Sequence, residues 1–203
     1  ADILHQELQV INERGKSVYY ELIRLPLFYP DGRRKSMILL GHDITARKQL
    51  EQRLSHEAKY DALTNLLNRR YFEERLEAAI HYTQRFKHPM SVCLCDIDKF
   101  KSVNDIHGHQ RGDAVLQQFS QIVRTELRSV DAAGRLGGDE FGILLSGSNA
   151  QESLNCLTRI RKRLECTIFK NGNGRYFGVS GSFGIAEWSP TIHTKEALLE
   201  SAD

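Results

Sequence analysis

A glycine pair between two apolar runs constrains the fold more than any other stretch of the sequence. The letters "RLGGDEFGILL" at residues 135–145 contain the pair, which separates expected strands at residues 132–136 and 141–146. Gly-Gly is a frequent loop of β-hairpins because glycine reaches the backbone angles that such tight turns need. The sequence therefore predicts an antiparallel hairpin that carries two acids, Asp139 and Glu140, at its tip.

The elements expected around this hairpin alternate between helices and strands. Periodicity predicts helices at residues 68–87, 111–129 and 150–165, a strand at 91–96 and a strand pair within 175–188. From residue 91 the order is strand, helix, strand, strand, helix, strand. This order favours an α+β fold, ferredoxin-like or palm-type, in which an antiparallel sheet carries its helices on one face, over a doubly wound parallel sheet. Residues 194–203 are expected to begin a further helix.

The first part of the chain has a different pattern. Residues 8–44 contain short β-favouring runs separated by a turn at Pro30, Asp31 and Gly32, which predicts a small antiparallel sheet. A sheet of about 40 residues seldom folds alone. We therefore expect it to be the end of a larger domain whose beginning lies upstream.

A polar, helix-favouring segment follows at residues 45–60, with Thr45 as the expected N-cap. Leu50, Leu54 and Ala58 are spaced four apart and share one face of this helix. Two interpretations fit the stripe: a connecting helix that pairs with its twin in a dimer, or a helix that packs on its own domain.

Composition excludes several classes of protein. The 203 residues include 40% hydrophobic and 27% charged side chains, as in ordinary globular proteins, and the formal net charge is only +2. That charge requires neither nucleic acid nor an anionic membrane as a partner. No apolar run approaches the ~20 residues of a membrane span, and Cys93 and Cys95 alternate with apolar residues as buried thiols do. We expect a cytoplasmic chain that contacts no nucleic acid and no membrane, with an upstream membrane anchor left open.

Acidic residues gather where a predicted strand ends. The strand expected at residues 91–96 ends at Asp96, and Asp98 lies two residues further on the same side of the extended chain. If the hairpin neighbours the strand, its tip brings Asp139 and Glu140 close to Asp96, and such carboxylates repel one another unless a cation neutralises them. Mg²⁺ suits this set because it takes carboxylate oxygens together with substrate phosphates. The alternative is a set of solvated acids at an ordinary hairpin tip.

A further motif, "NDIHGHQRGD" at residues 104–113, is interpreted as a Gly-rich loop that leads into a helix at Asp113. Backbone amides at such a helix start face phosphate in many nucleotide sites. An ordinary turn followed by a helix cap is the alternative.

Four motifs together resemble one family. "DALTNLLNRR", "DIDKFKSVNDIHGHQRGD", "RLGGDEF" and "VSGSFGIAEW" stand in the order and spacing of the GGDEF domain family of diguanylate cyclases, over residues 58–203. Members of this family join two GTP molecules into cyclic di-GMP and release pyrophosphate. One departure is Asn65, where the family usually has glycine, and asparagine tolerates a left-handed turn better than most residues.

The resemblance implies a role for each matching residue. The expected magnesium (or manganese) ligands are Asp96, the main-chain carbonyl of Ile97, Asp139 and Glu140. Glu140 is also a candidate to deprotonate the attacking hydroxyl, so Asp139 and Glu140 are the expected catalytic residues. The expected GTP-binding residues are Asn104 and Asp113 for guanine, His109 and Leu116 near the nucleoside, and Lys101 with the main chain of Lys99 and Phe100 for phosphate.

The resemblance also implies regulation and assembly. Each domain of the family holds one GTP, so the expected enzyme is a homodimer. Two metal ions are expected to assist attack and departure and to neutralise charge on the triphosphate. Arg128 and Asp131 form an RxxD motif that matches the family's site of inhibition by its product, cyclic di-GMP, and Arg159 falls where a supporting arginine is often found. For RxxD alone, a helix-end arginine with an acid in the following turn is the alternative.

The front of the chain resembles the last strands of a PAS sensor domain, in which "DIT" often precedes a charged helix. The expected organisation is therefore a PAS-like part at residues 1–44, a signalling helix at 45–60, and a GGDEF domain at 61–203 that stops before its last helix. The leading hypothesis is an active diguanylate cyclase. A catalytically silent module that binds GTP or cyclic di-GMP is the second hypothesis, and a related palm-type cyclase or polymerase, which would lack Asn104 and Asp113 together, is the third.

Overall fold

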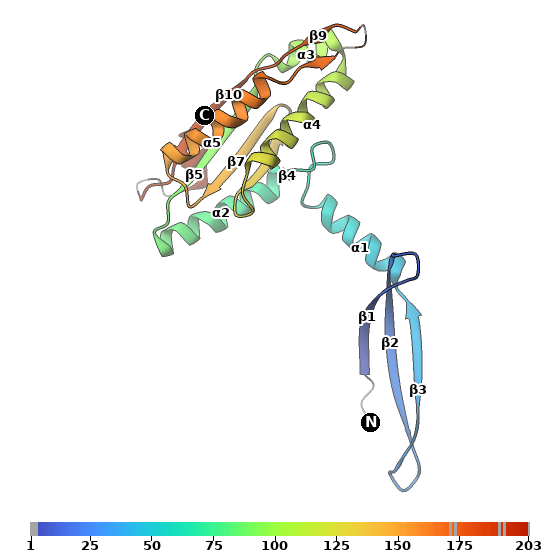
Figure 1. The fold of residues 1–203 in the computed structure, drawn as a ribbon. Coiled ribbons are helices and arrows are strands. Elements are labelled where there is room, and N and C mark those ends of the chain that lie inside the picture. Colours follow the sequence, from blue (N-terminus) through green and yellow to red (C-terminus); the bar gives the residue numbers. More distant parts are fainter. Residues whose placement is uncertain (1–3, 171, 173, 191, 193, 203) are drawn as a thin grey trace. The chain divides into compact units, whose positions relative to one another are not determined.

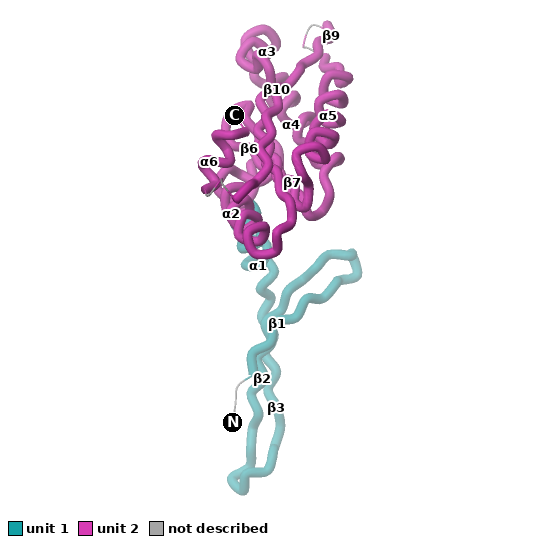
Figure 2. Tube along the Cα trace, turned by 90° about the vertical axis from the view of Figure 1, so that its left-hand side faces the viewer, with its two compact units in different colours: residues 1–56 teal, residues 57–203 magenta. Residues whose placement is uncertain are grey.

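The structure is a computed structural model and describes residues 4–170, 172, 174–190, 192 and 194–202. The chain folds into two compact units, Ala1–His56 and Glu57–Asp203 (Figure 2). In the described part of the chain, no helix is long and apolar enough to cross a membrane.

The first unit contains the antiparallel sheet that the sequence predicts. Its strands are β1 (Leu4–Ile11), β2 (Ser17–Phe28) and β3 (Arg34–Asp43), in the order β1-β2-β3 (Figure 1). Every residue of β3 is exposed. This sheet therefore buries little of its own apolar surface within the described chain.

Helix α1 (Thr45–Glu57) follows the sheet and ends three residues before the predicted boundary. Thr45 is not its N-cap, because the Thr45 hydroxyl accepts a hydrogen bond from the amide of Tyr19 at 2.9 Å, while the Asp43 carboxylate accepts from the amide of Thr45 at 2.9 Å. Lys48 forms an ion pair with Glu7 of β1 at 2.7 Å. No residue of α1 is buried, so its apolar stripe is left uncovered.

The second unit is built on a five-stranded sheet in the order β10-β5-β7-β6-β4. The strands are β4 (Leu67–Asn68), β5 (Met90–Ile97), β6 (Ala132–Gly137), β7 (Glu140–Ser146) and β10 (Gly181–Glu187). The order β10-β5-β7-β6 is antiparallel throughout and ferredoxin-like, which confirms the predicted fold class. The short edge strand β4 adds one parallel pairing with β6, which the sequence did not indicate.

Helices cover both faces of this sheet, so the expectation of helices on one face is wrong in part. Helices α4 (His109–Glu126) and α5 (Ala150–Glu165) pack on one face, with Cys93 and Cys95 of β5 among the residues they bury. Helices α2 (Arg69–Phe86) and α6 (Lys195–Glu200) pack on the other face, against Val92 of the same strand. The alternation along β5 follows from the period of two in a strand.

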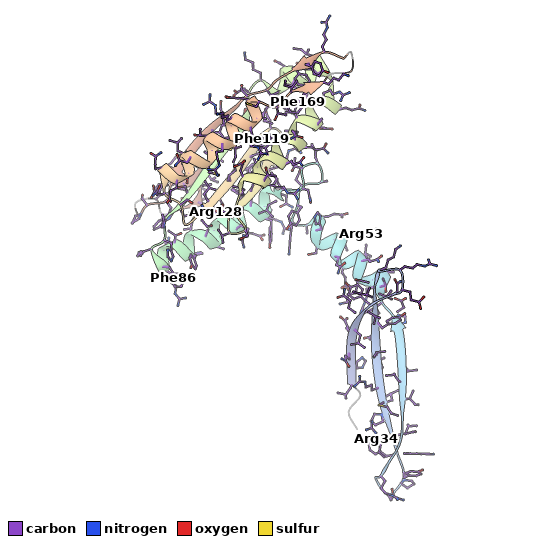
Figure 3. All side chains as sticks on the ribbon, viewed as in Figure 1. Arg34, Arg53, Phe86, Phe119, Arg128 and Phe169 are labelled. Atoms are coloured by element: carbon purple, nitrogen blue, oxygen red, sulfur yellow. The ribbon has the colours of Figure 1, made fainter. Side chains whose placement is uncertain are left out.

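The core beneath α4 is aromatic. Phe119 of α4 is labelled in Figure 3 and meets Phe141 of β7 edge to face, with 4.7 Å between ring centroids. The expected buried thiols are present, since Cys93 and Cys95 are free and buried. Burial raises the pKa of the Cys93 thiol to about 12, so this cysteine stays protonated.

Two predictions of secondary structure are wrong. Residues 104–113 are not a long loop: α3 (Phe100–His107) occupies their first part, and Gly108, at φ 85°, alone separates α3 from α4. The strands within 175–188 do not pair with each other, because β9 (Tyr176–Phe177) pairs with β8 (Phe169–Lys170) and β10 pairs with β5.

Candidate active site

The acidic cluster forms where β5 ends beside the start of β7. Asp96 of β5 and Glu140 of β7 are direct cross-strand partners, and Asp139 precedes Glu140 in the hairpin turn. Side chains of direct partners on neighbouring strands point to the same face of a sheet. The hairpin therefore does neighbour the strand, and its tip brings both of its acids to Asp96.

The electrostatics of Asp96 reflect this crowding. Burial raises the pKa of the Asp96 carboxyl above its ordinary value, and the negative charges of Asp139 and Glu140 raise it further. Asp98 contributes a smaller effect in the same direction. All the causes of this shift raise the pKa of Asp96, so a bound proton or cation would relieve the repulsion.

The donor set fits a hard divalent cation. Carboxylate and main-chain carbonyl oxygens are the ligands that Mg²⁺ and Mn²⁺ prefer. Within the described residues, no group of three or more His, Cys, Asp and Glu side chains is arranged to hold a metal by itself. An ion bound to Asp96 and Asp139 would thus need further oxygens from main chain, water or a phosphate ligand, which is the usual coordination of Mg²⁺.

Asp98 lies in a different environment from Asp96. Its carboxylate accepts hydrogen bonds from the hydroxyls of Ser180 at 2.5 Å and Ser182 at 2.7 Å, and these bonds lower its pKa. Its amide donates to the Ser180 carbonyl at 3.0 Å. Asp98 thus ties the end of β5 to β10, directly after the residue whose carbonyl the resemblance assigns to the metal.

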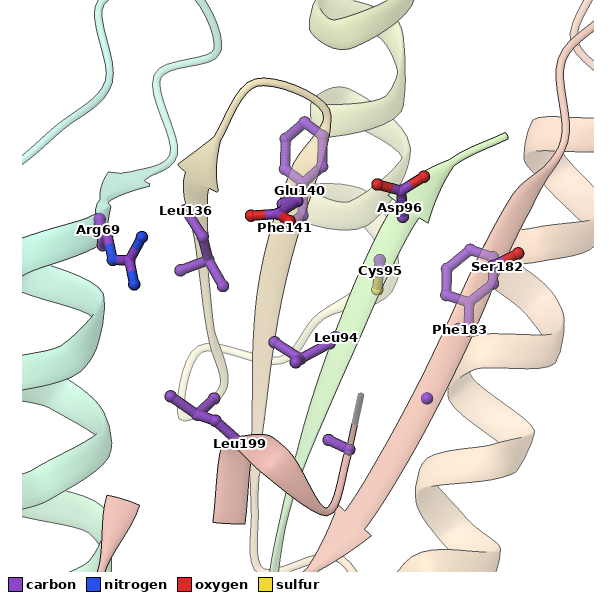
Figure 4. Close-up of a pocket in the computed structure, with 12 residues that line it drawn as sticks. Arg69, Leu94, Cys95, Asp96, Leu136, Glu140, Phe141, Ser182, Phe183 and Leu199 are labelled. Atoms are coloured by element: carbon purple, nitrogen blue, oxygen red, sulfur yellow. The ribbon is translucent and has the colours of Figure 1, made fainter. Parts of the chain in front are cut away.

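A pocket of about 470 Å³ opens beside the cluster, with Asp96 and Glu140 in its lining (Figure 4). Arg69, at the start of α2, lines the same pocket and brings a positive charge to it. Apolar side chains form much of the remaining wall: Leu94, Leu136, Phe141, Phe183 and Leu199. The sequence reasoning missed Arg69, although it lies in the quoted motif "DALTNLLNRR".

The predicted phosphate-binding turn forms the start of α3. Lys99 takes a left-handed conformation, at φ 55°, and no side chain caps the helix that follows. The first amides of an α-helix lack partners within the helix and favour anions. Lys101 is exposed in the first helical turn, and Phe100 is half-buried, so the turn can present main-chain amides and one flexible cation.

The predicted guanine readers lie on two helices that pack together. Asn104 is half-buried on α3, and Asp113 is exposed on α4. Asp113 does not begin its helix as expected, because α4 starts four residues earlier, at His109, which is exposed. Leu116 is only 1% exposed and belongs to the hydrophobic core beneath these helices, so it offers little surface to a ligand.

One arginine connects the hairpin tip to the start of the second unit. The Nε and Nη2 atoms of Arg135 both donate to the carbonyl of Gly138, at 2.9 and 2.7 Å, and its Nη1 lies 3.3 Å from the Asp61 carboxylate. Burial alone would raise the pKa of Asp61, but hydrogen bonds from Thr64 and the charge of Arg135 leave it lowered. A single guanidinium therefore holds the residue before Asp139 in place.

The RxxD residues meet at the opposite end of the β6–β7 hairpin from the acidic cluster. The side chain of Asp131 is buried, at 1% exposed, and accepts hydrogen bonds from the amides of Arg128 at 3.0 Å and Ser146 at 3.2 Å. The Arg128 guanidinium lies 3.4 Å from Asp131 and donates to the Ser148 hydroxyl at 2.6 Å. Figure 3 labels Arg128 at this end.

Arg159 lies in the same neighbourhood but contacts another acid. Its Nε donates to Glu126 at 2.9 Å, and Arg163 donates to the same carboxylate at 2.6 Å. Burial raises the pKa of the Cys156 thiol. Four nearby charged side chains also influence this pKa: Arg159, Asp131, Glu126 and Arg128. The three predicted residues of this second site are therefore gathered around one thiol, without a hydrogen bond between Arg159 and the other two in the described structure.

Residues 58–203 match the family described as "Diguanylate cyclase, GGDEF domain". The chain belongs to this family. Its members generally use divalent metal ions, in agreement with the donor set around Asp96. The match covers the whole second unit apart from its first residue, and leaves the first unit unassigned.

Named relatives share this part of the chain. The diguanylate cyclase DgcS of Shewanella oneidensis is 39% identical over 152 residues, which cover 75% of this chain and 49% of DgcS. The diguanylate cyclase DosC of Escherichia coli K12 is 41% identical over 144 residues, covering 70% of this chain and 31% of DosC. The chain thus spans half or less of the length of these relatives.

A solved structure has the same fold. The coiled coil and GGDEF domain of DgcB from Caulobacter crescentus, in complex with c-di-GMP, superposes with a TM-score of 0.73 at 29% identity. The alignment covers 78% of this chain and 83% of the DgcB chain. Its similarity supports the mixed α+β architecture described above.

Proposed function

We propose that this chain is a diguanylate cyclase, which condenses two GTP molecules into cyclic di-GMP and releases two pyrophosphates. The observation that carries the proposal is the meeting of Asp96 with Asp139 and Glu140 at the end of β5, next to the helix pair that presents Asn104 and Asp113. The first group suits a cation and its triphosphate, and the second suits guanine. Named relatives that are diguanylate cyclases support the same activity.

The residues in and beside the acidic cluster form two binding sets, one for the metal ion and one for phosphate. Asp96, the carbonyl of Ile97, Asp139 and Glu140 would hold magnesium or manganese. When bound, the ion supplies positive charge for the triphosphate and for the phosphorus under attack. The main chain of Lys99 and Phe100 and the ammonium of Lys101 bind phosphate oxygens, because they offer donors at the start of α3.

The base is selected by complementary donors and acceptors. The Asp113 carboxylate accepts from the guanine N1–H and the exocyclic amine, and the Asn104 amide donates to ring acceptors. Adenine offers the opposite pattern along this edge, so it leaves both side chains unmatched. His109 and Leu116 border the nucleoside.

The reaction is an in-line displacement repeated twice. The 3′-hydroxyl of one GTP attacks the α-phosphorus of the other, a new P–O bond forms, and the bond to the pyrophosphate oxygen breaks. Glu140 takes the proton of the attacking hydroxyl in this proposal. Because each domain binds one GTP, two chains must face each other, and the uncovered stripe of α1 supports pairing through this helix.

We further propose that cyclic di-GMP inhibits the enzyme at Arg128, Asp131 and Arg159. A guanidinium binds phosphate with its planar fork and stacks on guanine, and DgcB is known in complex with c-di-GMP. Residues 1–44 remain assigned to a PAS-like input domain as a prediction, and we expect the chain to work in the cytoplasm, where GTP and Mg²⁺ are available.

The direct test is to incubate the chain with GTP and Mg²⁺ and to separate the products by chromatography. Cyclic di-GMP and pyrophosphate should appear, and Asp96→Ala and Asp139→Ala should each abolish them, while Glu77→Ala, an exposed acid on α2, should not. Tight GTP binding with no product at any protein concentration would instead identify a silent nucleotide-binding module.

A further inference from the structure

We propose that Gly112 is a specificity-determining position, because its missing side chain sets the place of the Asn104 carboxamide that reads the base. The inference rests on the proposed function, in which that base is guanine. Gly112 lies in α4, one residue before Asp113, and is buried against α3.

While the Asn104 side chain keeps its present position, its contact with Gly112 leaves no room for a side chain at position 112. A Cβ atom added to Gly112 would lie 1.9 Å from Oδ1 of Asn104 and 3.0 Å from its Cγ. It would also lie 3.1 Å from Cζ of Phe100. Real Cβ atoms essentially never come as close as 1.9 Å to another heavy atom, so the carboxamide oxygen rests directly on the α4 backbone.

The backbone does not explain this glycine. Gly112 is inside a regular helix and does not have a positive φ, unlike Gly108 at φ 85°. Alanine is a better helix former than glycine at such a position. Helix propensity alone would therefore favour alanine at position 112. We infer that glycine is present because the Asn104 side chain occupies the space that a Cβ atom would need.

Packing is also the main restraint on Asn104. In the structure as described, its side chain makes no hydrogen bond with another residue, although it is half-buried. The amide is free to donate to a ligand, and its position is set by Gly112 and Phe100. This is a pre-positioned polar group, whose partner must come from outside the chain.

A methyl group at position 112 should weaken the recognition of the base and leave the fold intact. The nearest atoms to the added Cβ belong to the end of a flexible side chain, so Asn104 can rotate away at little cost to stability. The displaced Asn104 carboxamide can no longer donate a hydrogen bond to the base in the same direction, whereas Asp113 keeps its position. Affinity for GTP and discrimination against other bases should fall, with the chemical step preserved.

The experiment compares Gly112→Ala, Asn104→Ala, the double variant and Gln121→Ala, an exposed control on α4, in the full chain. Initial rates are measured with GTP, ITP and ATP, and binding is measured with 3′-deoxy-GTP, which cannot cyclise. We expect Gly112→Ala to raise KM for GTP about tenfold or more, equal to at least ~1.4 kcal/mol, with kcat within about twofold. The preference for GTP over ATP should fall in parallel, and the thermal midpoint should stay near that of the parent chain.

The double variant decides whether Gly112 acts through Asn104. If it does, Gly112→Ala adds little to Asn104→Ala, and the two effects are strongly non-additive. Fully additive effects, or an unchanged KM in Gly112→Ala, would overturn the inference. A parent chain that binds no guanine nucleotide would overturn the proposed function itself, so the two failures are distinguishable.

Discussion

Replacing Asp96 by asparagine should stabilise the metal-free chain, although it removes a residue proposed to be essential for turnover. The pKa of Asp96 is raised by burial and by Asp139 and Glu140, so the ionised carboxylate is unfavourable in the folded state. Like charges directly opposite on neighbouring strands destabilise a sheet by roughly 0.2–1 kcal/mol. For a domain of this size, 1 kcal/mol shifts the thermal midpoint by roughly 2–4 °C, so Asp96→Asn should raise the midpoint by about 0.4–4 °C.

The sign of this effect depends on pH. Because the folded-state pKa of Asp96 lies above its unfolded value, the folded state holds this proton more tightly, and the penalty appears only as pH rises through the folded pKa. The advantage of asparagine should therefore be present at pH 7.5 and vanish at acidic pH, below the ordinary value of 3.8.

Asp98→Asn is the matched control and should have the opposite sign. Hydrogen bonds from Ser180 and Ser182 lower the pKa of Asp98, so its ionised form stabilises the fold above pH 3.8, and this contribution is lost as pH falls through the folded pKa. Thermal unfolding is followed by circular dichroism with a chelator, and again with Mg²⁺ and 3′-deoxy-GTP. If Asp96→Asn lowers the midpoint at pH 7.5 as Asp98→Asn does, the repulsion inferred for the acidic cluster does not exist.

Three further substitutions test other parts of the account. Arg135→Lys should lower kcat about tenfold without unfolding the chain, because one ammonium cannot bind both Asp61 and the carbonyl of Gly138. An unchanged kcat would show that the Arg135 contacts do not position the hairpin turn that carries Asp139. Arg128→Ala should relieve inhibition by added cyclic di-GMP without lowering the initial rate, and inhibition of the parent strength would exclude the proposed second site. Gly142→Ala should cost about 1–3 kcal/mol of unfolding free energy in urea, because its Cβ would lie 2.6 Å from the buried Phe72 ring; a parent-like midpoint would mean that the ring moves aside freely.

The local patterns predicted most of the ferredoxin-like core, because its glycine turn, the apolar runs of β5 and β7 and the helical period of its long helices are visible in the sequence. The hairpin and β5 also determine the acidic cluster, since their register follows from the glycine turn and the apolar alternation. Helix α3 escaped prediction because it is short and begins directly after Lys99, whose left-handed conformation is not suggested by its side chain. Its start nevertheless forms the turn expected to bind phosphate.

Contacts between distant residues were beyond local reasoning. The Asp61–Arg135 pair joins residues 74 positions apart, and neither side chain stands out in the sequence. Arg69 reaches the pocket only because α2 packs on the face opposite α4 and α5, an arrangement that the ferredoxin-like pattern does not include. Asp98 appeared equivalent to Asp96 in the sequence, and only the hydroxyls of β10 distinguish the two carboxylates.

The most direct measurement is the binding of Mn²⁺ in the presence of 3′-deoxy-GTP, followed by electron paramagnetic resonance. The parent chain should immobilise Mn²⁺ only when the nucleotide is present, and Asp96→Asn and Asp139→Asn should each weaken this binding severely, because the two carboxylates are proposed to share one ion. Undiminished, nucleotide-dependent Mn²⁺ binding in both variants would contradict the central claim.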